Sequence, residues 1–253
     1  VLKQWAIIYF QFRNVLFIVL LNYSLLASVS WRLSFLVYLI GLISIVFCVL
    51  FLPNERISED SEKRESGIFV KYYRFIIAMF LLMFTFFIYP TEFAIETSKK
   101  GIIPQHFIAA IMAGMDFIAF LGGLSFIHIK KCAGHTTRII APILFILGYT
   151  ALWTIGGWTG AILGSFFIGF ANGLGIPYII STASVQAGKS AAVTVMPLLS
   201  MSLYLAQFTT PLIISLIASL LGQVAADHLP YFIAIISAIL FTAWSFAIKC
   251  DKN

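Results

Sequence analysis

The sequence predicts an all-α membrane protein with eight transmembrane helices, and three observations lead to this prediction. Of the 253 residues, 61% are hydrophobic and only 10% are charged, whereas about a quarter of the residues in soluble domains are charged. The mean hydropathy is +1.00. Apolar runs of about 20 residues, the length that crosses a hydrocarbon core, recur eight times along the chain. These features exclude a soluble enzyme domain, a disordered chain and a disulfide-stabilised scaffold.

The eight apolar runs are separated by polar loops of unequal length. They cover residues 14–29, 33–52, 75–95, 104–129, 139–155, 160–183, 191–221 and 230–248. The first is the weakest because Asn14 and Asn22 interrupt it, and the second ends before Pro53. Residues 54–74 carry a dense series of charged side chains that no other loop resembles. We therefore predict a charged cytoplasmic linker at 54–74, with two helices before it and six after it.

The positions of the basic residues predict the orientation of the chain. If both chain ends lie in the cytoplasm, most of the 16 Lys and Arg residues fall on the cytoplasmic side, as the positive-inside rule expects. Only Arg32, Lys99 and Lys100 remain outside. We therefore assign the net charge of +6 to cytoplasmic loops and not to nucleic-acid binding. The predicted location is the cell (inner) membrane, which the chain crosses several times.

Polar side chains within the apolar runs are candidates for a solute or proton pathway, because ionisable and amide groups are costly in lipid. The candidates are Asn22, Glu92, Asp116, Asn172 and Gln207. The runs 33–52, 139–155 and 230–248 contain no Asp, Glu, Asn, Gln or His. This period of three is typical of transporters built from three-helix repeats. It predicts that these three runs face lipid.

Two interpretations remain open for each of these candidates. Asp116 lies near the middle of its run and either carries a proton or contacts solute, or else makes a structural hydrogen bond to a neighbouring helix. Glu92 is placed at a cavity mouth, and Glu96, one helical turn later, is expected to be solvated. Asn172 and Gln207 offer donors and acceptors that suit uncharged or zwitterionic ligands, although they could equally join helices.

Small residues and prolines mark the runs 160–183 and 191–221. Gly169 and Gly173 are four residues apart, and Gly175, Pro177 and Pro211 follow. Glycines at this spacing let two helix backbones approach closely, while a proline removes a backbone donor and bends a helix. These residues therefore predict either close helix packing or a moving joint.

Four segments, in order along the chain, resemble the major facilitator superfamily of membrane transporters. SWRLSF at 30–35 and FLP at 51–53 resemble the two ends of helix 6 of that family, and 54–74 resembles its central loop. GFANGLGIP at 169–177 resembles helix 10, and YLAQFTTP at 204–211 resembles helix 11. The resemblance covers essentially the whole chain and implies helices 5 to 12. Residues 1–53 would be the last two helices of the N-terminal bundle, and 75–253 the complete C-terminal six-helix bundle.

The resemblance implies a secondary active transporter that moves a small solute by alternating access, with a proton as the expected coupling ion. Two features of the family are missing. The loop that begins at Lys130 lacks the acidic residue of the family's loop signature, and residues 10–30 lack the Gly-Pro-x-x-Gly-Gly antiporter signature. The resemblance also implies that helices 1 to 4 are missing, so we expect the chain alone not to transport.

The candidate residues do not form a cluster of the kind that catalysis requires. They occur singly, one per apolar run or nearly so, and Cys48, Cys132 and Cys250 have no metal-binding spacing. We therefore expect no enzyme activity, cofactor or metal, and we expect a small solute, a coupling ion and the lipid bilayer as partners. Two alternatives stay open, namely a membrane-embedded enzyme acting on a lipid or lipid-linked substrate, and a non-transporting member of the same superfamily.

Overall fold

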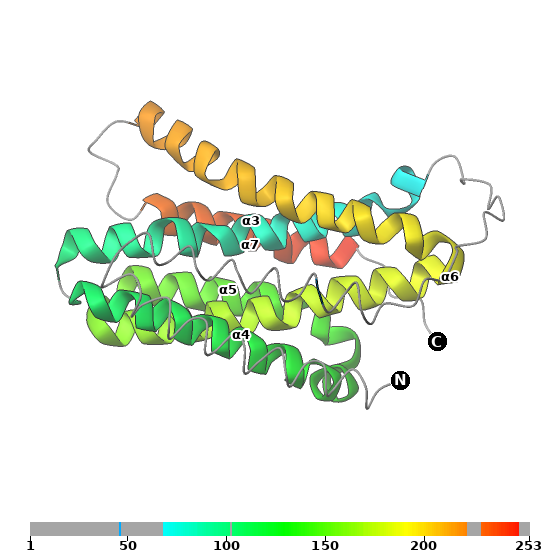
Figure 1. The fold of residues 1–253 in the computed structure, drawn as a ribbon, viewed down its shortest axis with the longest axis horizontal. Helices are drawn as coiled ribbons and strands as arrows, with labels where there is room; N and C mark the ends of the chain where they lie inside the picture. The colour runs from blue at the N-terminus through cyan, green and yellow to red at the C-terminus, as the bar shows by residue number, and fades with distance from the viewer. Residues whose placement is uncertain (1–45, 47–67, 102, 222–228, 248–253) are drawn as a thin grey trace. The chain divides into compact units, whose positions relative to one another are not determined.

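The computed structural model describes residue 46 and residues 68–101, 103–221 and 229–247 (Figure 1). Within these ranges every regular element is a helix, and no strand is present. The helices are α3 (Ile68–Lys100), α4 (Gln105–Ala133), α5 (Thr137–Thr154), α6 (Gly157–Leu221) and α7 (Leu229–Ala247), and a 3-10 turn, η2 (Gly134–Thr136), joins α4 to α5. All belong to one compact unit, Lys63–Asn253. The predicted runs 14–29 and 33–52, with Asn22, lie outside the described residues.

Five helical segments are long and apolar enough to cross a membrane, which is consistent with an integral multi-pass membrane protein. They are Phe69–Lys100, Gln105–Thr154, Gly157–Gly188, Ala191–Leu220 and Leu229–Phe246. The second contains both α4 and α5, which η2 connects without a break. The long α6 supplies two segments, because Gly188 has a φ of 65° and interrupts its helical geometry. Each apolar run predicted between residues 75 and 248 overlaps a helix.

The helix α3 begins at Ile68, so residues 68–74 of the predicted linker are helical. Tyr72 and Phe75 are buried in this first part of the helix, and Trp244 of α7 donates a hydrogen bond of 2.9 Å to the carbonyl oxygen of Arg74. Aromatic burial and this contact therefore hold the charged start of α3 against the bundle.

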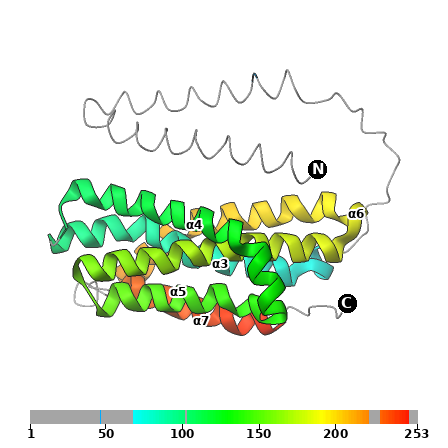
Figure 2. The ribbon, with the colours of Figure 1, turned by 90° about the horizontal axis from the view of Figure 1, so that it is seen from below.

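The helices of this unit differ strongly in burial. Figure 2 shows α5 and α7 side by side on one side of α3, with α4 on the other side. Of the 29 residues of α4 only four are buried, whereas the 18-residue α5 buries eight. The runs 139–155 and 230–248, which correspond to α5 and α7, were expected to face outward. For α5 this expectation is wrong, because α5 is more buried than α4. The reason is that α5 packs on both α6 and α7, while α4 packs chiefly on α6.

Glycines bring α4 and the first half of α6 into backbone contact. A Cβ atom at Gly173 would overlap the carbonyl oxygen of Ala119 on α4, and one at Gly169 would overlap that of Met115. Such contacts are possible only where a side chain is missing. Of the two predicted roles, close packing and a moving joint, the structure therefore shows close packing at Gly169 and Gly173.

The other glycine and the two prolines that the sequence analysis named in α6 have different surroundings. Gly175 faces α3, where a Cβ atom would overlap the side chain of Leu82. Pro177 and Pro211 lie inside the helix, and the break in helical geometry is at Gly188. A φ of 65° is a conformation that glycine adopts more readily than residues with a Cβ atom. The break therefore falls in the loop predicted between the runs 160–183 and 191–221, and not at either proline.

The second half of α6, residues 189–221, packs with one face only. The buried residues recur every three or four positions, as expected for a single helix face, and they are Ala191, Val195, Leu199, Ser202, Ala206, Thr210 and Ile214. Ser202 donates a hydrogen bond of 2.7 Å to the carbonyl oxygen of Ile76 and so attaches this half to α3. The other face is exposed.

Candidate functional site

Asp116 lies in the middle of α4, on the exposed side of that helix. Its neighbour Met115 is buried against α6, whereas Phe117 is 49% exposed. The bounds of α4 place Asp116 near the middle of this helix, and its side chain lies on the exposed face. Its predicted depth at the centre of a bilayer stays a prediction.

Gln207 occupies a similar place in the second half of α6. It is exposed, and Tyr204 and Phe208 beside it are 66% and 68% exposed. This amide and the carboxylate of Asp116 thus lie on the exposed faces of the two least buried helical segments. The structure does not bring Gln207 into hydrogen-bonding contact with Asp116 within the described residues.

Asn172 differs because it is buried in the first half of α6, with 9% of its surface exposed. Its side-chain oxygen accepts no hydrogen bond from the described part of the chain. A buried acceptor of this kind is usually satisfied in native proteins. Asn172 therefore offers an acceptor that a water molecule or a bound N–H or O–H group can use.

Glu92 and Glu96 lie at the end of α3, where the structure corrects one expectation. Glu96 is not solvated, because only 3% of its surface is exposed. Its carboxylate lies 3.9 Å from the ammonium group of Lys99, one turn away on the same helix. Glu92 is half-buried one turn earlier and interacts electrostatically with both residues. The structure thus brings these two carboxylates together, and it is Glu96 that borders the cavity found here.

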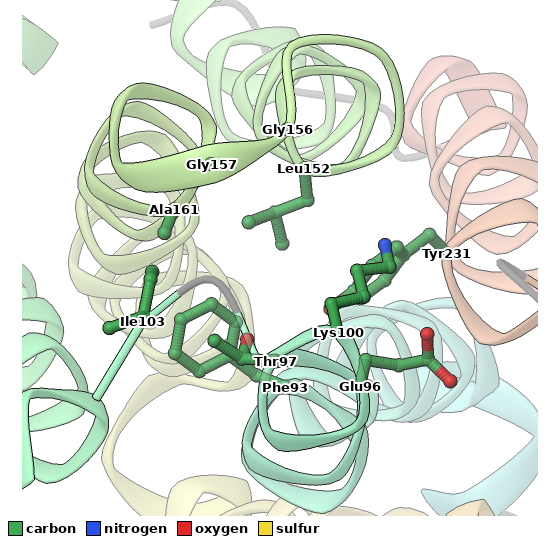
Figure 3. A pocket seen from close by; sticks show the side chains of 10 residues that line it. All are labelled: Phe93, Glu96, Thr97, Lys100, Ile103, Leu152, Gly156, Gly157, Ala161 and Tyr231. Carbon is green, nitrogen blue, oxygen red and sulfur yellow. The ribbon is translucent and has the colours of Figure 1, made fainter. Parts of the chain in front are cut away.

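That cavity has a volume of about 40 Å³ and lies between α3, the start of α6 and the ends of α5 and α7 (Figure 3). A space of this size holds a few water molecules. Figure 3 shows Glu96, Lys100 and Tyr231 on one side of the cavity and Phe93 and Ile103 on the other, with Leu152 projecting between them. The complete lining is Phe93, Glu96, Thr97, Lys100, Ile103, Leu152, Gly156, Gly157, Ala161 and Tyr231.

Sequence analysis missed a group of buried hydroxyls next to this cavity. Tyr89 shares a hydrogen bond of 2.5 Å with Ser165 on α6, and Tyr149 of α5 donates one of 2.5 Å to the carbonyl oxygen of Thr85. The hydroxyl of Thr85 lies 2.7 Å from that of Ser237 on α7. Four helices are therefore joined by side-chain hydroxyls inside the bundle.

One sequence signal could have revealed this group. Thr85, Tyr89, Glu92 and Glu96 are spaced by four, three and four residues, which places them on one face of α3. Hydroxyl groups are less costly in an apolar run than charged or amide groups, so the hydroxyls on this face are a weaker signal than Glu92 and Glu96.

Comparison of the chain with protein-family models, with curated proteins and with solved structures found no match. The helical architecture is compatible with an integral multi-pass membrane protein.

Proposed function

We propose that this chain is part of a secondary active transporter of the major facilitator type, which moves a small solute by alternating access. The observation that carries the proposal is the position of Asp116 and Gln207 on the exposed faces of two apolar, sparsely buried helical segments. An ionisable group at the bilayer centre costs about 2.5 to 3.5 kcal/mol on insertion scales. Such faces therefore favour a water-filled pathway over lipid.

The polar groups available to a solute suggest its chemistry. Asp116 offers carboxylate oxygens, and Asn172 offers a buried oxygen that lacks a donor within the described residues. Both are acceptors, so a solute with N–H or O–H groups suits them. Gln207 adds an amide that both donates and accepts. We propose an uncharged or zwitterionic small molecule as the solute and a proton as the coupling ion.

The backbone features of α6 support alternating access. The tight contacts of Gly169 and Gly173 join α4 and the first half of α6 into one body, while the conformation of Gly188 separates the second half from it. Hinges in proteins are a few positions that absorb large changes in φ and ψ. We propose that residues 189–221 change their angle at Gly188 when the pathway opens to the other side.

The orientation and location remain part of the same proposal. Both chain ends would lie in the cytoplasm of the cell (inner) membrane, as the distribution of Lys and Arg favours. The Lys130 and Arg138 end of the bundle would then face the cytoplasm, and the cavity beside Glu96 would face outward.

Thiol accessibility tests the proposal without knowledge of the solute. The three cysteines are replaced by serine, the full chain is reconstituted in lipid vesicles, and single cysteines are introduced as Asp116→Cys and Gln207→Cys. A charged methanethiosulfonate reagent reacts with thiols in water and not with thiols in lipid. We expect both variants to react. The matched control is Leu240→Cys, a 55% exposed position on α7, which should not react because it would face lipid.

If the thiols at 116 and 207 are as unreactive as the thiol at 240, the exposed faces border lipid and the proposal is wrong. If they react, both faces border water and the proposal is supported. Because the chain alone is not expected to transport, uptake of labelled solutes with and without a pH gradient is then measured with the intact parent protein and with its Asp116→Asn variant.

A further inference from the structure

The connection between α4 and α5 is a strongly basic part of the described chain. Lys130, Lys131 and Arg138 lie close together in sequence, with His135 between them. The acidic residues of the described part are Glu92, Glu96 and Asp116, and none of them lies in this connection. Nor does the first turn of α5 contain an acidic residue. The end of α4 and the start of α5 therefore carry positive charge, and no carboxylate lies in the connection between them.

Arg138 lies in the first turn of α5, and its guanidinium stacks on the ring of Phe246 of α7, 5.0 Å from the ring centroid. A stacked guanidinium uses its flat face for the ring and keeps its N–H groups at the edge. Those N–H groups form a planar fork that matches two oxygens of a phosphate. The positive end of the α5 helix dipole adds to the potential at this position.

Lys130 completes the arrangement from the α4 side. Its ammonium group lies 3.3 Å from the hydroxyl of Ser181 on α6 and 5.5 Å from the centroid of the Phe126 ring. Lys131 next to it is exposed. Neither contact neutralises the charge of a lysine. Cations from α4 and α5 thus lie on both sides of the three-residue turn Gly134–Thr136.

Apolar surface adjoins these cations. Ile127, one turn before Lys131, is 55% exposed, and Phe246 is 58% exposed. Both lie on helical segments that are apolar enough to cross a membrane, so acyl chains can cover them. A soluble anion would use the cations alone, whereas a phospholipid would use the cations for its phosphate and the apolar side chains for its acyl chains.

From this arrangement we infer that the α4–α5 connection binds the phosphate headgroup of an anionic membrane phospholipid. The headgroup lies between Arg138 and the two lysines, and the acyl chains run along Ile127 and Phe246. The site is separate from the proposed solute pathway on α4 and α6, and it does not depend on the proposed function.

The experiment uses the purified full chain in a mild detergent, with phosphatidylglycerol as the anionic probe and phosphatidylcholine as the zwitterionic one. Bound lipid is counted by native mass spectrometry, and the apparent Tm is recorded over a lipid titration. We expect phosphatidylglycerol to raise the Tm and to stay bound, and phosphatidylcholine to do neither. Arg138→Gln should weaken phosphatidylglycerol binding about tenfold, the size of one lost charge-assisted hydrogen bond.

Three further variants separate the headgroup site from a general charge effect. Arg138→Lys keeps the charge but loses the fork, so we expect an intermediate affinity. Lys131→Gln, at an exposed position, should weaken binding about threefold and gives a result even if Arg138→Gln folds poorly. The matched control Lys99→Gln removes a lysine beside Glu96 and should leave phosphatidylglycerol binding unchanged.

Three results would each overturn the inference. They are equal stabilisation by phosphatidylglycerol and phosphatidylcholine, an effect of Lys99→Gln as large as that of Arg138→Gln, and full reproduction of the stabilisation by inorganic phosphate. The last result would mean that the connection recognises a soluble anion without using the apolar surface.

Discussion

Glu96 and Asp116 are both carboxylates within long apolar helices, yet the structure gives them opposite surroundings. Glu96 is 3% exposed, lies beside Lys99 and borders a cavity with Tyr231 of α7. Asp116 lies on the open face of α4. The position of a residue along a helix indicates depth in a membrane, but the helices packed around it decide whether its side chain is covered.

The same contrast extends to whole segments. The most apolar windows of α3 and of Gly157–Gly188 are 56% and 61% buried, whereas those of Gln105–Thr154 and Ala191–Leu220 are each 17% buried. The buried pair contains Thr85, Tyr89 and Ser165 of the hydroxyl network, and the exposed pair contains Asp116 and Gln207. Buried polar groups thus join the helices of this bundle through hydrogen bonds, while Asp116 and Gln207 remain on exposed faces.

The largest effect should come from breaking the contact that joins an exposed helix to a buried one. Gly173→Ala places a methyl group against the carbonyl oxygen of Ala119, and because backbone cannot rotate away, we expect a loss of about 2 to 3 kcal/mol. Folded yield after detergent extraction and the apparent Tm measure it. Gly114→Ala is the control, since a Cβ atom there meets nothing within 4 Å. Equal behaviour of the two variants would mean that α4 does not pack on α6 as described.

A smaller effect should distinguish the two carboxylates. Glu96→Ala enlarges the cavity and leaves Lys99 without its partner, so we expect a loss of about 1 to 2 kcal/mol. Asp116→Ala, on an exposed surface, should stay within about 0.5 kcal/mol of the parent. Thermal unfolding of both purified variants in the same detergent provides the comparison. A greater loss in the Asp116 variant would reverse our assignment of which carboxylate is structural.

The smallest effect concerns the hydroxyl network. Tyr149→Phe removes a buried hydrogen bond to the carbonyl oxygen of Thr85 without changing the packing of the ring, so about 1 kcal/mol should be lost. Tyr204→Phe, at a position that is 66% exposed, should have no measurable effect. The difference between the two apparent Tm values is the readout. If Tyr149→Phe does not change the apparent Tm, the hydrogen bond from Tyr149 to Thr85 contributes no net stability.

Much of the fold could be predicted from the sequence, because the length of each apolar run follows directly from the order of the residues. Each predicted run that begins at residue 75 or later overlaps a helix. The spacing of Gly169 and Gly173 left close packing and a moving joint open, and the structure shows close packing there. Helix ends were less accurate. The helix α3 begins before the predicted run, because Lys71 and Arg74 make residues 68–74 resemble a linker although Tyr72 between them is buried.

The candidate site was predictable only in part. Asp116, Asn172 and Gln207 were found because charged and amide side chains are rare in apolar runs. The tyrosines were not found, because a phenol is compatible with both lipid and core, and its role depends on whether another helix supplies a partner. Tyr89 gains that role from Ser165, which lies 76 positions later in the chain.

The sequence by itself determined that this protein is helical, apolar enough to cross a membrane several times and marked by a few polar residues within its spans. Those properties depend on each segment alone, through its length and composition. The tertiary structure decided which carboxylate is covered, which helices stay open and which hydroxyls meet inside the bundle. Those outcomes depend on contacts between residues far apart in the chain, and the hydropathy of a single segment carries no information about its neighbours.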